Sequence, residues 1–249
     1  MADPIPAIML AGGRASPELA RAGHSDYRAL AAIHGQSMGS YVLRALRATP
    51  GIGEVVVVGP QACAILDADR FVASDAGIVA NTLAAFAACD FPVALVVTAD
   101  IPLVTPAAFT DYLGAAITSQ AAFCYSAIPR AVYERQLPRM KRTWVHLADG
   151  VYTGGNVVLI RQDALAAARR VLTLAVESRK QPWKLISLLG WRAIWRWYRC
   201  RLTLREIEMR AARLLDAPAA IVVAQHAALG ADVDKPEDLA AVRAILSPL

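Results

Sequence analysis

The sequence predicts an α/β protein built on a mixed, mostly parallel β-sheet with helices on its faces. Short runs of apolar, largely β-branched residues recur through the first half of the chain, at 5–11, 55–58 and 93–98. Segments with helical character separate these runs, and this alternation is typical of parallel strands joined by crossover helices. Glycine follows the first two runs, and Asp100 follows the third, at the positions where strands of such a sheet end.

The elements are expected in a simple order and within one domain, because no Gly- or Ser-rich linker divides residues 1–249. Thr105 and Pro106 mark one helix start, since Thr caps helices and Pro favours their first turn. The other expected elements are strands at 5–11, 55–58, 71–72, 93–98, 121–128, 151–160 and 219–224, a loop at 12–27, and helices at about 37–48, 79–89, 161–176 and 236–247.

Composition narrows the class of protein. Hydrophobic residues make up 56% of the chain, but no run of about eighteen apolar residues occurs, so we expect no membrane-spanning helix. The N-terminus lacks the basic start of a signal peptide, and we expect a cytoplasmic protein. The net charge of +5 suits an anionic substrate and does not require nucleic acid. The cysteines are far apart, form no CxxC pair and are expected to be reduced: Cys63, Cys89, Cys124 and Cys200.

One region departs from the average composition. Residues 179–213 hold ten Lys or Arg against two acids, together with four of the five tryptophans, and we expect a helical insertion at about 161–216. The favoured interpretation is a helical insertion whose aromatic side chains pack on the sheet domain while its arginines face water, and we expect it to form a lid over the acceptor side of a cleft. The alternative is a surface that binds an anionic bilayer, and outward-facing tryptophans would indicate it. The tryptophans are Trp183, Trp191, Trp195 and Trp197.

A glycine turn follows the first strand. Gly12 and Gly13 precede Arg14, and a second cation, Arg28, returns after the loop. Backbone N–H groups of such a turn can approach phosphates closely, and the two arginines can close over a polyphosphate. A tight turn without a ligand is the alternative, because the patterns of a P-loop and of a dinucleotide fingerprint are both missing.

Carboxylates follow at two further places. Asp100 ends the apolar run 93–98, and aspartate is unfavourable inside strands, so its position favours a functional role such as holding a divalent metal. Asp232 and Asp234 precede the last helix and lie on the same side of an extended segment. Helix capping by Asp234 is the alternative explanation, and it accounts poorly for Asp232.

Glycines also interrupt the strand expected at 151–160. Gly154 and Gly155 favour a bulge or a close approach of the backbone, and Asn156 then offers both a donor and an acceptor. The two interpretations are a structural bulge and a contact with a substrate hydroxyl.

These segments occur in a characteristic order: residues 10–14, 28–30 with 35–38, 98–103 and 232–239. In this order they resemble the nucleotidyltransferase superfamily with a GT-A-like fold, and most closely its molybdopterin guanylyltransferase-like (MobA-like) group. The resemblance covers about 1–110, 150–160 and 229–247. It implies a Rossmann-like α/β fold and a Mg²⁺-dependent transfer of a nucleotide from an NTP to a small phosphorylated acceptor, with pyrophosphate released.

The resemblance also implies roles for individual residues. Asp100 and Asp234 would hold Mg²⁺, with Asp232 as the second candidate, and Asn81 would contact the base or the ribose. The expected catalytic residues are Arg14, Arg28 and Asp100, the nucleotide contacts are Leu10, Ala11, Gly12, Gly13 and Asn81, and the acceptor contacts are Gly154, Gly155 and Asn156.

Two departures from the family pattern leave alternatives open. Arg28 stands where the family usually has lysine, and the loop between Arg14 and Arg28 is longer than usual. Either change alters the nucleotide preference or marks a degenerate site, so a non-catalytic nucleotide- or phosphosugar-binding protein is the main alternative. A GT-A glycosyltransferase that uses residues 232–234 as a DxD metal motif is a further one, and the late position of the motif disfavours it. The acceptor, the base and the oligomeric state stay open.

Overall fold

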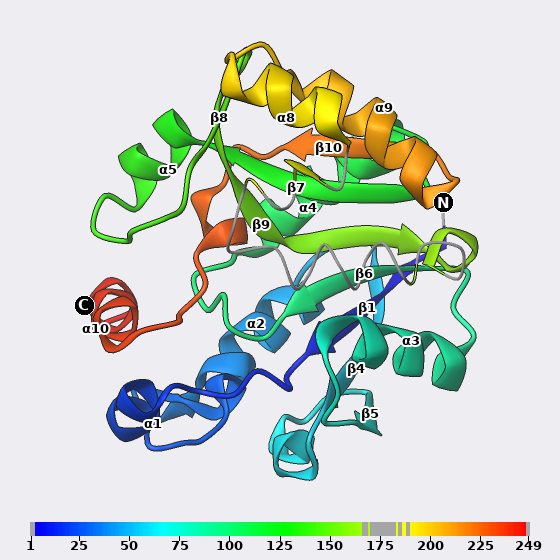
Figure 1. The fold of residues 1–249 in the computed structure, drawn as a ribbon. Helices are drawn as coiled ribbons and strands as arrows, with labels where there is room; N and C mark the ends of the chain where they lie inside the picture. Colours follow the sequence, from blue (N-terminus) through cyan, green and yellow to red (C-terminus); the bar gives the residue numbers. More distant parts are fainter. Residues whose placement is uncertain (1–2, 166–168, 170–182, 184–185, 188–189, 248–249) are drawn as a thin grey trace.

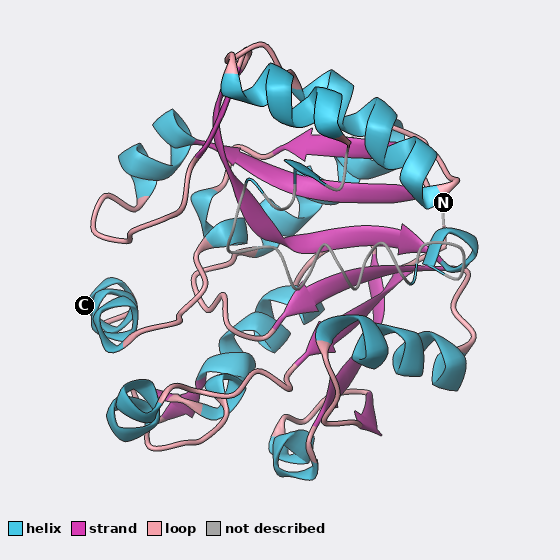
Figure 2. Ribbon diagram, in the orientation of Figure 1, coloured by secondary structure: helices cyan, strands magenta, loops and turns pink. Residues whose placement is uncertain are grey.

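The protein is described by a computed structural model over residues 3–165, 169, 183, 186–187 and 190–247. An eight-stranded sheet runs through its centre with helices on both faces (Figures 1 and 2). The strand order is β10-β7-β9-β6-β1-β4-β5, and β8 pairs with β9. The strands are β1 Ile5–Leu10, β4 Ile52–Gly59, β5 Arg70–Ala73, β6 Val93–Thr98, β7 Phe123–Pro129, β8 Val145–Leu147, β9 Gly150–Arg161 and β10 Ala219–Val223.

Strand β9 makes the sheet mixed, because it runs antiparallel to both β6 and β7. The other pairs along the order are parallel, as predicted. Strand β7 precedes the expected insertion in the sequence and β10 follows it. The two strands pair with each other, so the chain returns to the same sheet after the insertion. The helices are α1 Pro17–Gly23, α2 Met38–Arg47, α3 Ile78–Cys89, α4 Pro106–Thr118, α5 Arg130–Gln136, α8 Trp191–Tyr198, α9 Leu204–Leu215 and α10 Pro236–Ile245.

The central strands are apolar without alternation because both faces of the sheet are buried. Successive side chains of a strand point to opposite faces of the sheet, and the residues of each face belong to a separate core cluster. Met9 packs on one face with residues of α2 and α4, whereas Ile8 and Leu10 pack on the other face with Phe86 of α3. None of the described helices is long and apolar enough to cross a bilayer.

The structure corrects several sequence-based boundaries. The loop expected at 12–27 contains helix α1, whose start is capped by Ser16 and which has Pro17 in its first turn. These are ordinary helix-start signals, but the helix has only seven residues and shows no clear periodicity. Helix α5 and strand β8 were not predicted. The helix expected over 161–176 is present at 162–165, and most of the rest lies outside the described residues.

Pairing of β1 with β6 places the first two sequence motifs side by side. Leu10 and Thr98 are register partners at the carboxyl ends of these strands, and Ala99 N–H donates to the Leu10 carbonyl at 3.0 Å. Val233 N–H donates to the Asp100 carbonyl at 2.9 Å, which brings in the segment before α10. Three segments far apart in the sequence therefore meet at one edge of the sheet.

Candidate active site at the carboxyl edge of the sheet

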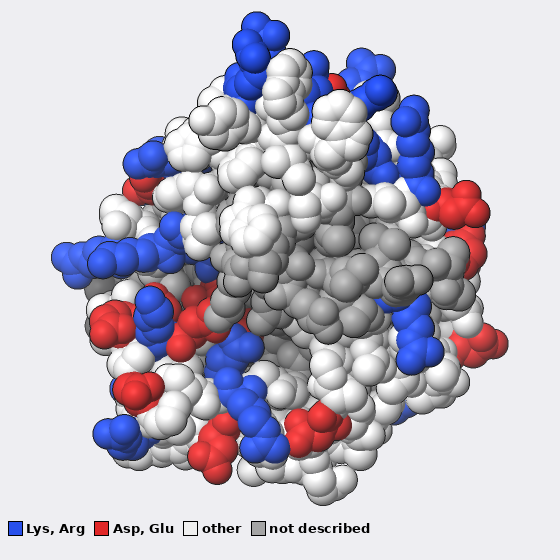
Figure 3. All heavy atoms as spheres, viewed as in Figure 1, with Lys and Arg blue, Asp and Glu red and all other residues white. Residues whose placement is uncertain are grey.

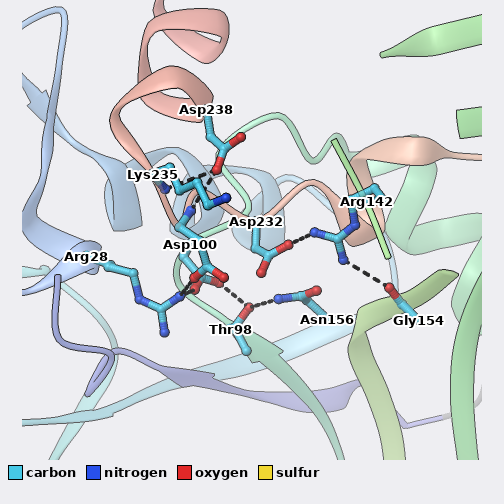
Figure 4. Close-up of polar contacts among 10 residues, drawn as sticks. Arg28, Thr98, Asp100, Arg142, Gly154, Asn156, Asp232, Lys235 and Asp238 are labelled. Carbon is cyan, nitrogen blue, oxygen red and sulfur yellow. Dashed lines mark hydrogen bonds and ion pairs between the residues drawn. The ribbon is translucent and has the colours of Figure 1, made fainter. Parts of the chain in front are cut away.

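A single guanidinium joins two carboxylates at this edge. Arg28 Nη1 lies 2.7 Å from Asp100 Oδ2 and also contacts Asp234 Oδ1 (Figure 4). The Arg28 and Asp100 side chains are only 15% and 8% exposed, so solvent screens this ion pair weakly. Asp100 and Asp234, which the resemblance places on one Mg²⁺ ion, therefore converge at the carboxyl edge of the sheet.

A chain of hydrogen bonds orients the Asp100 carboxylate. Thr98 Oγ1 donates to Asp100 Oδ1 at 2.5 Å, and Asn156 Nδ2 donates to Thr98 Oγ1 at 3.0 Å (Figure 4). The Asn156 side chain thus links β9 to the end of β6. Asn156, expected to contact the acceptor, is used in this structure to hold Thr98 and through it Asp100.

The first glycine turn makes room for Arg28. A Cβ atom at Gly13 would lie 2.7 Å from Arg28 Nη2 and 2.8 Å from Arg28 Nε, which is closer than real contacts allow. The Arg28 N–H also donates to the Gly13 carbonyl at 2.8 Å. Gly13 is therefore required for the position of the guanidinium.

Gly12 packs against a different residue. Its Cβ would lie 3.0 Å from Nδ2 of Asn81, which is buried. Asn81 Oδ1 accepts from Ser74 Oγ at 2.7 Å and from Ala76 N–H at 3.2 Å. The amide oxygen of Asn81 thus holds the loop after β5, while the Nδ2 end faces the glycine turn.

Packing within the sheet explains why glycine stands at positions 154 and 155 of β9. The register between β7 and β9 shifts between Tyr125 and Ala127, so the expected bulge is present. A Cβ at Gly154 would overlap the Tyr125 hydroxyl, and a Cβ at Gly155 would overlap Ser126 Oγ. Close packing against β7 therefore explains both glycines without a substrate.

Gly155→Ala is expected to destabilise the fold by about 1–3 kcal/mol, a typical cost of overpacking. Ser126 is fully buried and donates to the Val157 carbonyl at 2.8 Å, so it has no free space into which to move. Urea unfolding measures the loss. Gly114→Ala in α4 is the matched control, because its Cβ meets nothing within 4 Å; an equal loss in both variants would contradict this explanation.

Arg142 is a residue that the sequence analysis missed. Its Nη1 pairs with Asp232 Oδ1, and its Nη2 donates to the Gly154 carbonyl at 3.3 Å (Figure 4). Its guanidinium carbon lies 5.9 Å from the centre of the Tyr133 ring, and its buried Nε has no hydrogen-bond partner among the described residues. Asp232 and Asp234 thus belong to one site but contact different arginines.

A cavity of about 690 Å³ opens beside this cluster, between α1 and the start of α10. Arg14, Arg28 and Lys235 supply positive charge to its walls, and Glu18, Asp234 and Glu237 supply negative charge. Arg14 points outward, with its side chain 64% exposed, and pairs with Asp75 at 2.8 Å. The two expected phosphate cations therefore line one cavity but point in different directions, and Lys235 is a third cation that sequence reasoning did not single out.

The last acidic segment divides into capping and site residues. Asp238 Oδ2 accepts from the Lys235 N–H at 3.0 Å and the Asp234 N–H at 3.2 Å, and thereby caps α10. Burial raises the pKa of the Asp238 carboxyl above its ordinary value, although the two backbone N–H groups oppose this shift. The Asp234 side chain is not the cap, because its carboxylate contacts Arg28.

The donor set at the cluster fits a magnesium ion. Carboxylate oxygens are the ligands that Mg²⁺ prefers, and Mg²⁺ commonly binds one or two carboxylates while substrate phosphates and water complete its shell. Asp100 Oδ2 and Asp234 Oδ1 already share one positive group, Arg28 Nη1. Among the described residues no cluster of three or more His, Cys, Asp or Glu could hold a metal alone, so phosphate oxygens would have to complete the shell.

Several solved structures are similar to this chain in overall fold. A hypothetical transferase from Thermus thermophilus is 31% identical and has a TM-score of 0.82, with 94% of this chain and 99% of that chain covered. CMP:2-keto-3-deoxy-manno-octonic acid synthetase complexed with CTP is 15% identical, with a TM-score of 0.63 over 98% of each chain. Its likeness shows the fold alone.

A third solved structure has the same fold. 2-C-methyl-D-erythritol 4-phosphate cytidylyltransferase from Thermus thermophilus is 16% identical, with a TM-score of 0.55, and 96% of this chain and 97% of that chain are covered. No match was found among curated protein sequences. The model of the MobA-like NTP transferase domain matches residues 7–187, which is well over half of the chain. This chain therefore belongs to the MobA-like NTP transferase family.

Proposed function

We propose that the chain is a Mg²⁺-dependent nucleotidyltransferase that transfers a nucleoside monophosphate from an NTP to a small phosphorylated acceptor and releases pyrophosphate. The observation that carries this proposal is the pair of carboxylates, from the end of β6 and the segment before α10, that share one cation beside a cavity lined by three cations and three carboxylates. Such a pair suits a metal that bridges protein and triphosphate.

In this proposal the triphosphate lies over the turn formed by Gly12 and Gly13, with Leu10 and Ala11 beneath it. Arg14, Arg28 and Lys235 supply positive charge from the cavity wall. Asn81, whose Nδ2 lies next to Gly12, would contact the nucleoside. Asp100 and Asp234 would hold Mg²⁺, with Asp232 as the second candidate, and the bound ion would neutralise charge on the phosphates.

We assign residues 154–156 and Arg142 to the part of the site that binds the acceptor. Arg142 faces the same cluster from the opposite side to Arg28 (Figure 4). An arginine pair on the two sides of the reacting phosphorus can hold the donor and the acceptor in line. Nucleotidyl transfer depends on positioning and on neutralised charge more than on an acid–base residue. The lack of a catalytic histidine or cysteine in this cluster therefore agrees with the chemistry.

Pyrophosphate release tests the proposal. The full chain is incubated with Mg²⁺, each of the four NTPs and a panel of acceptors that includes sugar 1-phosphates, phosphorylated polyols and pterin phosphates. We expect release that depends on one NTP, one acceptor class and the metal. NTP binding by calorimetry without turnover on any acceptor would instead indicate the non-catalytic binding protein.

Arg142→Ala is expected to raise the KM for the acceptor by about 10- to 100-fold, because a charge-assisted hydrogen bond is worth about 1.5–3 kcal/mol. The KM for the NTP should change little, since Arg28 and Lys235 line the donor cavity. Steady-state kinetics with each substrate varied in turn gives the two constants. Exposed Arg139 provides the matched control, Arg139→Ala; a rise confined to the NTP would remove Arg142 from the acceptor side.

A further inference from the structure

Helix α8 presents aromatic side chains to solvent. Trp191, Trp195 and Tyr198 are 72%, 52% and 84% exposed. Helices α8 and α9 belong to the region of about 161–216 that the sequence predicts as a helical insertion. The favoured sequence-based interpretation, a lid with its tryptophans turned toward the cleft, does not account for these side chains.

The exposure follows from how α8 packs. Its inner face is formed by Ala193 and Trp197, which lie in one cluster with Leu147 of β8 and Leu202. Because a helix turns by about 100° per residue, Trp191 and Trp195 lie on the opposite face, and Ile194 and Tyr198 extend the same stripe. The inner face already has its partner, so the outer stripe is left for a partner outside this fold.

Arginines lie beside the stripe. The guanidinium carbon of Arg192 lies 5.4 Å from the centre of the Trp191 ring, and that of Arg199 lies 4.8 Å from the Trp195 ring. Residues 191–201 contain no Asp or Glu. Arg196 is different, because it pairs with Glu206 of α9 at 2.9 Å and thereby ties the two helices together. In Figure 3, basic side chains gather along the upper edge over α8 and α9, around an uncharged area.

We infer that the outer face of α8, defined as Trp191, Arg192, Ile194, Trp195, Tyr198 and Arg199, docks on the surface of an anionic lipid bilayer. Trp and Tyr favour the depth of the lipid headgroups, where the ring is half in hydrocarbon and the polar atom is in water. Arginine keeps its charge among the headgroup phosphates while its stem lies along apolar surface. A helix with both features lies in the interfacial plane.

The charge of this face favours an anionic bilayer over a second copy of the chain as its partner. Two arginines stacked on the exposed rings, with no acid between residues 191 and 201, complement a negatively charged surface. A second copy of this chain would place the same arginines against each other, because a twofold interface pairs identical patches. The inference does not depend on nucleotidyl transfer, so it is tested without nucleotide or acceptor.

Vesicle sedimentation is the test, with the full chain and phosphatidylcholine vesicles that contain or lack phosphatidylglycerol. We expect sedimentation with the anionic vesicles only, together with a blue shift of tryptophan emission. Trp191→Ala/Trp195→Ala should abolish both signals. Arg192→Gln/Arg199→Gln should weaken binding by about 25-fold, at about fivefold for each arginine near an anionic surface.

Matched controls separate a specific face from general stickiness. Ile65 and Ile117 are exposed apolar residues elsewhere on the molecule, and Arg135 and Arg139 are exposed arginines outside α8. Ile65→Ala/Ile117→Ala and Arg135→Gln/Arg139→Gln should bind as the unchanged chain does. Circular dichroism checks that every variant keeps its helices.

Three results would overturn the inference. The first is the absence of sedimentation with anionic vesicles, and the second is equal binding to neutral vesicles. The third is a dimer, detected by light scattering, that Trp191→Ala/Trp195→Ala abolishes while vesicle binding is absent. That result would make the face an interface between copies of the chain.

Discussion

Asp100→Asn is expected to lower the rate of nucleotidyl transfer by about 10³-fold, because it removes a negative charge at the centre of the cluster. Its carboxylate faces Arg28 Nη1 at 2.7 Å and its side chain is only 8% exposed, so the lost charge is weakly replaced by solvent. Loss of one preorganised charged group from a water-poor site costs about 10²–10³ in rate, and loss of a metal ligand adds to this. Pyrophosphate release under saturating Mg²⁺ and NTP measures the effect.

Asp111→Asn is the control for this variant. Asp111 is an aspartate on α4 whose exposed carboxylate pairs with His226 at 2.7 Å on the surface. It should leave the rate unchanged. If Asp100→Asn retains more than about a tenth of the rate while its fold is intact, the assignment of Asp100 as a metal ligand and catalytic residue is wrong.

Arg28→Ala is expected to cost about 2–4 kcal/mol of transition-state stabilisation, the range for removal of one charged donor from such a site. It should also lower the free energy of unfolding by about 3 kcal/mol, because Asp100 and Asp234 are left facing each other without their shared cation. Kinetics and urea unfolding give the two values separately.

The same variant tests the metal site. With Arg28 removed, Mg²⁺ should take the place of the guanidinium between the carboxylates, so millimolar Mg²⁺ should raise the melting temperature of Arg28→Ala more than that of the unchanged chain. Arg47→Ala, which breaks an exposed pair with Asp69, should show no added response to Mg²⁺. An Arg28→Ala protein with unchanged kinetics and no response to Mg²⁺ would remove Arg28 and the metal from the site.

Arg28→Lys is the informative companion. Lysine keeps the charge but replaces the planar guanidinium with a compact ammonium group on a flexible stem, so it is not geometrically equivalent to Arg28 Nη1, which contacts both carboxylates. Substantial activity in this variant would identify Arg28 as a tolerated replacement for the lysine usual in the family. Strong loss would identify a specialised role for the guanidinium.

The sheet and the positions of Gly13 and Asp100 at its edge were predictable because their signals are local. Buried parallel strands give uninterrupted apolar runs, so the ends of β1 and β6 could be located, and with them Gly13 and Asp100. Asp234 entered the prediction through the resemblance to the nucleotidyltransferases, whereas Gly13 and Asp100 were expected to lie together because strand ends of a parallel sheet meet at one edge. Pairing of β1 with β6 in the structure confirms that step.

Arg142 and helix α1 were not predictable in this way. Arg142 lies outside any regular element, and its importance comes from the approach of Asp232, ninety positions away in the sequence. Helix α1 is shorter than the range in which periodicity is reliable. For Gly155, the sequence left a bulge and a substrate contact equally open, and only the position of Ser126 on the neighbouring strand gives it a packing reason.

Strand β9 connects the two ends of the molecule that carry the main inferences. Tyr152 packs in the cluster beneath α8 and α9, and Asn156, four residues farther along the same strand, holds Thr98 and thus Asp100. A strand rises about 3.3 Å per residue, so about 13 Å of backbone separates these contacts. With α8 on a bilayer, this segment of β9 would set the height of the reacting phosphorus above the headgroups. Acceptors carried in the membrane would then be selected by the length of the group that joins their phosphate to the lipid.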